Sequence, residues 1–255
     1  SQPRMFIKAS QSLMNPVWSP DGSKLAVTGD NYIGIWVADV NSAELTQVSD
    51  ALGAGYQMTW SDAQNITSTP YDMVAGKRMT RIESVNVATG AITQVAAAER
   101  NFKRSKALNA KSALQTMLDE PMNATSIIAS MSEYAGKWVL NPALSPDGSK
   151  IAFQIQGKGM FVCNIDGTEL KSLGKGSHAT WLPDSKNIMV TQIKDNGDVF
   201  TSSDIYCVNI ANGKSMCITA NTDVIPVTMS VSPDGSKLAF DNDADGCIYI
   251  IDLKY

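Results

Sequence analysis

Several features that define common protein classes are missing from this 255-residue sequence. It has no run of about eighteen apolar residues, so no membrane-spanning helix is predicted. Charged residues make up only 18% of the chain, and the net charge is −4. Because nucleic-acid binding needs an excess of basic residues to neutralise phosphates, nucleic acid is not an expected partner.

Histidine and cysteine are also scarce. His178 is the only histidine, and no Gly-x-Ser-x-Gly motif is present, so a serine triad would depend on this one residue. The four cysteines form no Cys-x-x-Cys pair and have no nearby histidine, which excludes the common zinc spacings. We therefore interpret His178 as a loop residue between repeats.

One hexapeptide, Ser-Pro-Asp-Gly-Ser-Lys, occurs three times without change, at 19–24, 145–150 and 232–237. Two weaker copies surround Asp62 and Asp184. The five motif aspartates are 41, 85, 37 and 50 residues apart, and 85 is close to two periods of the others. A catalytic motif is needed once, whereas a copied structural unit repeats its turn, so the hexapeptide indicates architecture.

The composition of each repeat is typical of a β-propeller blade. Short β-rich apolar runs alternate with turn residues, and four strands fit a period near forty. Proline fixes the first corner of a type I turn, aspartate suits the second, and glycine takes the left-handed position. The hexapeptide is therefore predicted to join the first and second strands, and the turns at 88–90, 165–167 and 211–213 to join the third and fourth.

These repeats predict a single all-β propeller domain over residues 1–255. We expect six blades; the alternative is five blades with an inserted helical segment near 97–139, where Leu108, Leu114 and Met117 have roughly helical spacing. The last repeat ends after its third strand. We therefore expect residues near 4–9 to supply the missing outer strand and close the ring.

The pattern WSPDGxK followed by an apolar strand resembles the repeat of TolB-like β-propellers, which also occurs in the propeller of prolyl-oligopeptidase-type enzymes. The resemblance is strong over 15–48 and 141–253, weak over 57–95 and absent over 97–139. It implies a periplasmic or extracellular location, with any signal segment removed, and a protein-binding role like that of TolB. Neither the extra N-terminal domain of TolB nor the hydrolase domain of the peptidases is recognised in this sequence.

The segment from Asp241 to Asp252 comes close to the calcium-loop pattern D-x-[DN]-x-[DN]-G-x5-E, with aspartate replacing the final glutamate. Asp241, Asp243 and Asp245 are the candidate metal ligands, and calcium is the possible cofactor. The alternative is a polar connection between two strands in which turn geometry favours aspartate.

In a blade, the loops between the second and third strands share one face with the links to the next blade. These loops are longer and more varied here than the glycine-closed turns, and long loops are where binding usually occurs. The candidate binding residues on this loop-rich face, together with the loop histidine, are Tyr71, Asp72, Lys77, Arg78, His178, Asp195, Asp198, Asp204 and Asp223.

We therefore expect a non-enzymatic binding or scaffold propeller that holds a protein, peptide or glycan. The alternative is an enzyme or enzyme remnant, either a metal-assisted lyase or a peptidase propeller without its hydrolase domain.

A smaller structural question concerns Cys207 and Cys217. A three-residue loop at 211–213 would place them opposite each other and allow a disulfide, and a two-residue loop would forbid it.

Overall fold

The computed structural model describes residues 1–100 and 139–254, which form β-strands apart from connecting turns and a short 3-10 helix, η1 (Asp30–Tyr32). The strands form five antiparallel sheets of the β-propeller blade type. Two compact units divide the chain, one of residues 1–103 with 228–255 and the other of residues 104–227.

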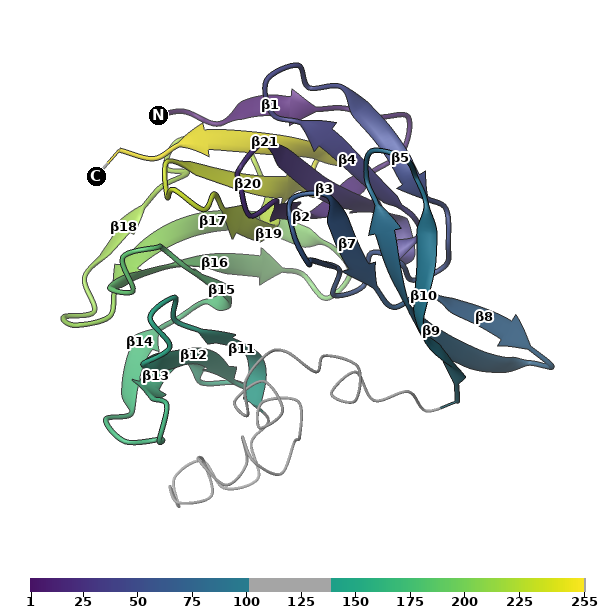
Figure 1. The fold of residues 1–255 in the computed structure, drawn as a ribbon. Helices are drawn as coiled ribbons and strands as arrows, with labels where there is room; N and C mark the ends of the chain where they lie inside the picture. Colours follow the sequence, from purple (N-terminus) through teal and green to yellow (C-terminus); the bar gives the residue numbers. More distant parts are fainter. Residues whose placement is uncertain (101–138, 255) are drawn as a thin grey trace. The chain divides into compact units, whose positions relative to one another are not determined.

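Three sheets belong wholly or mainly to the first unit (Figure 1). The first sheet has the order β2 (Leu13–Trp18), β3 (Lys24–Gly29), β4 (Ile35–Asp39), β5 (Leu45–Ser49). The second has the order β6 (Thr59–Trp60), β7 (Asn65–Ser68), β9 (Lys77–Asn86), β10 (Ile92–Glu99), and β8 (Tyr71–Val74) pairs with β9. The third has the order β19 (Pro226–Val231), β20 (Lys237–Asn242), β21 (Cys247–Asp252), β1 (Arg4–Ile7).

Two further sheets belong to the second unit. One has the order β11 (Val139–Leu144), β12 (Lys150–Ile155), β13 (Gly159–Asn164), β14 (Lys171–Gly174). The other has the order β15 (Ser177–Trp181), β16 (Asn187–Asp195), β17 (Phe200–Asn209), β18 (Ser215–Cys217). Each sheet buries apolar residues of its two middle strands, such as Ile188 and Val208.

The predicted turn chemistry is confirmed in all three copies of the hexapeptide. The turn glycines have φ values of 71°, 72° and 75°, the left-handed region that favours glycine. In the first copy, the Ser19 hydroxyl accepts a hydrogen bond from the Lys24 N–H (2.9 Å) and donates one to the Asp21 carboxylate (2.6 Å). The other two copies repeat both distances, so serine and aspartate together close the turn.

The hexapeptide lysine has a separate role, which the sequence did not reveal. Each lysine begins the second strand and lies opposite the last residue of the third, in the pairs Lys24–Asp39, Lys150–Asn164 and Lys237–Asp252. The Lys150 ammonium donates to the Asn164 amide oxygen at 2.6 Å, and Lys237 forms an ion pair with Asp252 at 2.7 Å. The lysine therefore ties the middle strands together next to the turn.

The motif tryptophans connect neighbouring sheets within each unit. The Trp60 indole N–H donates to the Val17 carbonyl at 3.0 Å, and the Trp181 indole donates to the Ala143 carbonyl at 2.9 Å. Trp18 makes the same bond to Ser230. In every case the acceptor carbonyl occupies the same position in the first strand of another sheet. The motif tryptophan therefore makes the same connection between sheets each time.

The prediction that the N-terminal strand completes the last blade is confirmed, because β1 pairs antiparallel with β21. The all-β propeller fold is confirmed as well. The preferred count of six blades is one too many: residues 1–100 and 139–254 form five, as in the alternative. The helical segment proposed near 97–139 lies outside the described residues except at its edges, where residues 97–99 belong to β10. None of the described residues forms a helix long and apolar enough to cross a membrane.

Candidate functional site

The hairpin of β8 and the first half of β9 carries four of the predicted binding residues. The sequence interpretation treated this segment as a loop, but it is a paired hairpin that projects from its sheet (Figure 1). Ala75 and Gly76 form its two-residue tip, both with positive φ, a conformation typical of tight hairpins. Tyr71 and Asp72 lie on one strand, and Lys77 and Arg78 on the other, so the structure brings these four together.

The tip of this hairpin exposes apolar side chains next to basic ones. Met73 and Val74 are 58% and 57% exposed. The Arg78 guanidinium lies over the Tyr71 ring, 4.0 Å from its centre, in a cation–π contact. Exposed methionine and valine beside a stacked arginine and tyrosine form a surface of the composition found at protein interfaces.

An ion-pair chain holds the base of the hairpin. Arg81 contacts the Asp72 carboxylate through Nη1 and the Glu83 carboxylate through Nε, both at 2.5 Å. Burial lowers the pKa of Arg81, but its hydrogen bonds and charge interactions with Glu83 and Asp72 together outweigh burial and raise it. Asp72 is therefore an anchor of the hairpin, and is less available to a partner than the sequence suggested.

The link between β5 and β6 packs beside the hairpin and adds further exposed rings. The Tyr71 N–H donates to the Leu52 carbonyl at 3.0 Å, which fixes this link against β8. Tyr56 meets Tyr32 edge to face, with ring centres 5.2 Å apart. Leu52, Tyr56 and Tyr32 are each about two-fifths exposed. We call the exposed side chains of Tyr32, Leu52, Tyr56, Met73, Val74 and Arg78, together with the half-buried Tyr71, the hairpin surface.

Four predicted aspartates lie in the second unit. Asp195 ends β16 and accepts the Gly197 N–H at 3.0 Å, and Asp198 is exposed in the next turn. Asp223 is exposed in the link after β18. Asp204 was predicted on a loop but lies inside β17, where it accepts the Thr219 hydroxyl at 3.0 Å. The loop position predicted for Asp204 was wrong because β16 and β17 continue, paired, as far as the turn at 196–199.

The three predicted calcium ligands do not share one environment. Asp241 is buried in β20, where its carboxylate accepts hydrogen bonds from Thr228 and from the Asn15 N–H. Asp245 accepts hydrogen bonds from the Cys247 N–H and the Tyr249 hydroxyl, which lower its pKa although burial acts against them. Within residues 1–100 and 139–254, no three His, Cys, Asp or Glu side chains form a group that could hold a metal. Calcium binding stays a prediction, and Asp241 acts first as a link between strands.

His178 lies in the first strand of its blade, and not in a loop as expected. Its φ is 51°, at an irregularity in the pairing of β15 with β16. Asn15, Gln57 and Asn141 have φ values between 50° and 54° at the same place, three residues before the motif Trp or Leu. A polar residue at this repeated position is the signal that the sequence interpretation missed, and it assigns His178 to a backbone irregularity shared by four blades.

The pairing of β17 with β18 settles the question about the two cysteines. Cys207 lies opposite Met216, and Cys217 lies opposite Tyr206, so the two cysteines point to opposite faces. The connecting loop has four residues, Ile210 to Gly213, and neither of the two lengths considered. Both thiols are free.

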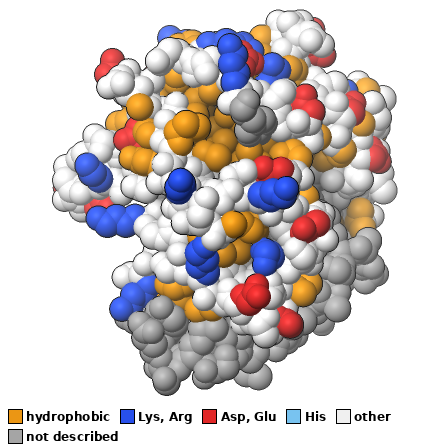
Figure 2. Space-filling model, turned by 90° about the vertical axis from the view of Figure 1, so that its left-hand side faces the viewer, with side chains coloured by type: hydrophobic (Ala, Val, Ile, Leu, Met, Phe, Trp, Pro, Cys, Tyr) orange, Lys and Arg blue, Asp and Glu red, His pale blue; other side chains and the backbone are white. Residues whose placement is uncertain are grey.

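Charge is mixed on the surface in view in Figure 2. Lys and Arg side chains alternate with Asp and Glu and with apolar areas, and no continuous basic patch is visible in this view. This distribution agrees with the low net charge and gives no support to a nucleic-acid interface on this face.

No protein-family model and no curated protein matches the chain. Solved structures with similar folds include a chain of the mitotic checkpoint complex, with a TM-score of 0.50, 11% identity, and coverage of 100% of this chain and 94% of that one. An oligogalacturonate lyase from Vibrio parahaemolyticus has a TM-score of 0.49 and 12% identity, with 98% and 80% of the two chains covered. TolB from Acinetobacter baumannii has a TM-score of 0.38 and 14% identity, and this chain spans 57% of its length. The likeness is one of fold.

Proposed function

We propose that this protein is a non-enzymatic binding module that holds a protein partner on the hairpin surface. The observation that carries the proposal is the β8–β9 hairpin, which projects from its sheet with Met73 and Val74 more than half exposed. Exposed apolar side chains on a projecting element of a folded protein are typical of interaction sites. Resemblance of the repeats to TolB-like propellers supports a place in the bacterial envelope or outside the cell.

The partner fits a segment that combines acidic and apolar residues. Lys77 and Arg78 lie at the hairpin tip, while Arg81 at the base is shared by Asp72 and Glu83. The tip, residues 73–78, is therefore net positive and would steer an acidic partner, with affinity coming from Met73, Val74 and the aromatic rings.

The test is capture from cell-envelope and culture-medium extracts, followed by affinity measurement with the purified captured protein. We expect Met73→Asp with Val74→Asp to weaken its binding by at least about tenfold, since two central apolar contacts are lost. The matched control is Met216→Asp, an equally exposed methionine (61%) on β18 of the second unit. Repeating the capture with calcium and with a chelator tests the 241–252 loop at the same time.

Three results would oppose the proposal. The captured protein could bind the hairpin variant as tightly as the wild type, the control could lose as much affinity as the hairpin variant, or no protein could be retained in any extract. Melting temperatures of both variants show whether a loss reflects binding or folding.

A further inference from the structure

A cleft lies between the two sheets of the second unit, beside the hexapeptide turn at 145–150. Its volume is about 600 Å³, within the range of small-molecule sites. The walls come from strands β12 to β14 on one side and from the turns of the β15–β18 sheet on the other. The lining includes Lys150, Val162, Glu169, Lys171, Lys186 and Ile210.

The first unit has a cleft at the corresponding place, which provides an internal comparison. Its lining residues include Lys24, Asp39, Glu44 and Thr46, and its volume is about 170 Å³. Lys24 and Lys150 are the same hexapeptide position, and each lies opposite the third-strand residue, Asp39 or Asn164. Two blades with the same turn therefore enclose clefts of different size.

Two lining positions also differ in charge, both in the same direction. Lys171 stands where the first unit has Thr46, and Lys186 where it has Gln64, and each adds one positive unit to the second-unit cleft. Beside the cleft, Asn164 stands where the first unit has Asp39, and Asp166 where it has Asn41, so these two differences cancel. The first unit keeps the hexapeptide lysine but has no lysine at the positions of Lys171 and Lys186.

The turn carboxylates near this cleft are already engaged. Asp147 accepts hydrogen bonds from the Ser145 and Ser149 hydroxyls and from the Ser149 N–H. Asp184 accepts them from the Lys186 and Asn187 N–H groups and from the Asn187 amide. These hydrogen bonds lower the pKa of both groups and keep them ionised, so Asp147, Asp184 and Glu169 balance the charge of the three lysines. An anion in the cleft would therefore depend on the free N–H donors of the lysines.

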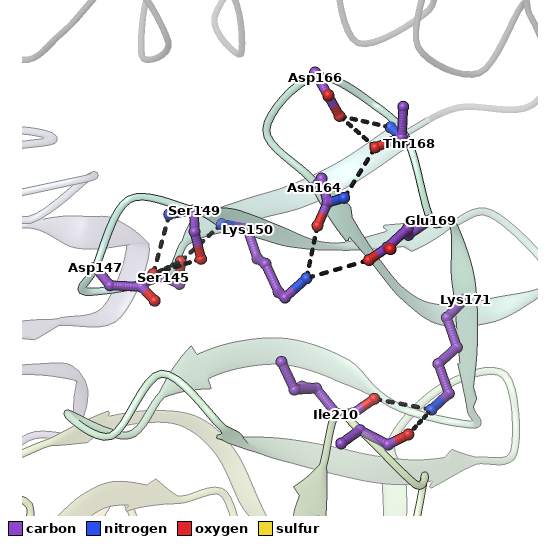
Figure 3. A network of polar contacts seen from close by, with 11 residues as sticks. Ser145, Asp147, Ser149, Lys150, Asn164, Asp166, Thr168, Glu169, Lys171 and Ile210 are labelled. Atoms are coloured by element: carbon purple, nitrogen blue, oxygen red, sulfur yellow. Dashed lines mark hydrogen bonds and ion pairs between the residues drawn. The ribbon is translucent and has the colours of Figure 1, made fainter.

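The ammonium groups retain donors for a ligand. Lys150 donates to Asn164 and lies 3.8 Å from the exposed carboxylate of Glu169 (Figure 3). Lys171 crosses to the Ile210 carbonyl at 3.0 Å and to the Ala211 carbonyl. A lysine has three N–H donors, so each retains at least one beyond these contacts. Lys186 is exposed at the rim.

We propose that this cleft binds a small organic anion, with its carboxylate or phosphate facing the lysines and its apolar part against Val162 and Ile210. The proposal concerns a different unit and a different class of ligand from the hairpin surface. Either of the two proposals can therefore fail without the other.

The test is a titration of the isotope-labelled full chain, followed by amide NMR shifts. The probes share one ring and differ in charge: phenyl phosphate, benzoate, neutral benzyl alcohol and cationic benzylamine. We expect the two anions to shift amides around 147–150, 169–171 and 184–186, and to bind at least about tenfold more tightly than benzyl alcohol.

Variants that restore the residues of the first unit make the test specific. Lys186→Gln should weaken phenyl phosphate binding about threefold, and the double variant with Asn164→Asp about tenfold. Gln64→Lys in the first unit is the matched control and should leave the shifts at 147–150 unchanged. Equal affinity for the anion and the alcohol, shifts elsewhere on the chain, or unchanged affinity in the double variant would each overturn the proposal.

Discussion

Glu83 carries a buried charge at the base of the hairpin. Its side chain is only 7% exposed and pairs with Arg81, while its second carboxylate oxygen has no hydrogen-bond partner among the described residues. A buried charge is tolerated only when it is paired. The hairpin base therefore depends on Arg81, and the partly exposed Asp72 contributes less.

We predict that Arg81→Met destabilises the protein by about 3 kcal/mol, because it leaves the Glu83 charge buried without a partner. Adding Glu83→Gln should recover most of the loss, since the amide carries no charge. Asp72→Asn should cost less than about 1 kcal/mol, because Asp72 is 62% exposed. Urea unfolding of the four proteins measures these differences. A loss that Glu83→Gln does not reduce would mean that Arg81 acts through packing and not through charge.

At the residue scale, the sequence predicted what depends on local geometry. Proline, aspartate and glycine of the hexapeptide have conformational preferences of their own, so their roles followed from the motif. The role of Lys150 did not, because it depends on the strand register that places Asn164 opposite. Asp241 was misread for the same reason: its partners Asn15 and Thr228 are distant in sequence.

Among the elements, β1 is a short strand that completes a sheet built from the other end of the chain. It covers β21 with four residues, and Ile7, which is 3% exposed, packs with Ile248 and Ile250. Deleting residues 1–7 should lower the melting temperature by about 10 °C or more, because an apolar contact and an edge pairing are lost together.

Two point variants separate these contributions. Ile7→Ala should reproduce about half of the effect of the deletion, whereas Met5→Ala, at a side chain 48% exposed, should change the melting temperature by less than about 2 °C. Calorimetry provides the comparison. An unchanged melting temperature after the deletion would show that β21 does not need an outer strand.

Element lengths were predicted less well than element order. The motif fixed where each blade starts, but nothing in it fixes where the second and third strands end. β16 and β17 extend to the turn at 196–199, and β9 extends beyond β7 to pair with β8. Strand extension depends on a partner strand at the right distance, which is a tertiary property. Predicted loop residues such as Asp204 and Tyr71 thus became strand residues.

For the whole molecule, the number of blades followed from the motifs and not from the length of the chain. Five motif aspartates correspond to the five sheets of the described part of the chain. The sixth blade was inferred from the length of the segment after residue 97, and length alone carries no turn chemistry. The indole bonds of Trp18, Trp60 and Trp181 show why motif counting works, since each motif brings its own connection to another sheet.

The repeated turn aspartates also make the stability of the whole protein depend on pH. Hydrogen bonds from Ser19 and Ser23 lower the pKa of Asp21 to about 2, and those from Ser232 and Ser236 do the same for Asp234. The pKa of Asp147 is lowered in the same way. Because unfolded aspartate titrates near 3.9, these groups stabilise the fold above about pH 4 and cease to do so as the pH falls towards about 2.

At alkaline pH, the pKa shifts that affect stability are upward and not downward. Burial raises the pKa of Cys163 to about 11, and burial together with Asp245 raises that of Tyr249 to about 12. Their contributions are complete below the unfolded values of about 8.5 and 10 and are lost as the pH rises through the folded ones. Stability should therefore be flat between about pH 5 and 8 and fall on both sides.

The urea midpoint measured from pH 2 to 10 tests this dependence, and the three hexapeptide copies provide the control. The triple variant Asp21→Asn, Asp147→Asn and Asp234→Asn should be less stable than the wild type at pH 7, because amides accept these hydrogen bonds less strongly than carboxylates do. It should also lose less stability between pH 5 and pH 2, because the groups that titrate there are gone. An acid limb as steep as that of the wild type would assign the acid sensitivity to other carboxylates and show that the turns fold equally well with the aspartates protonated.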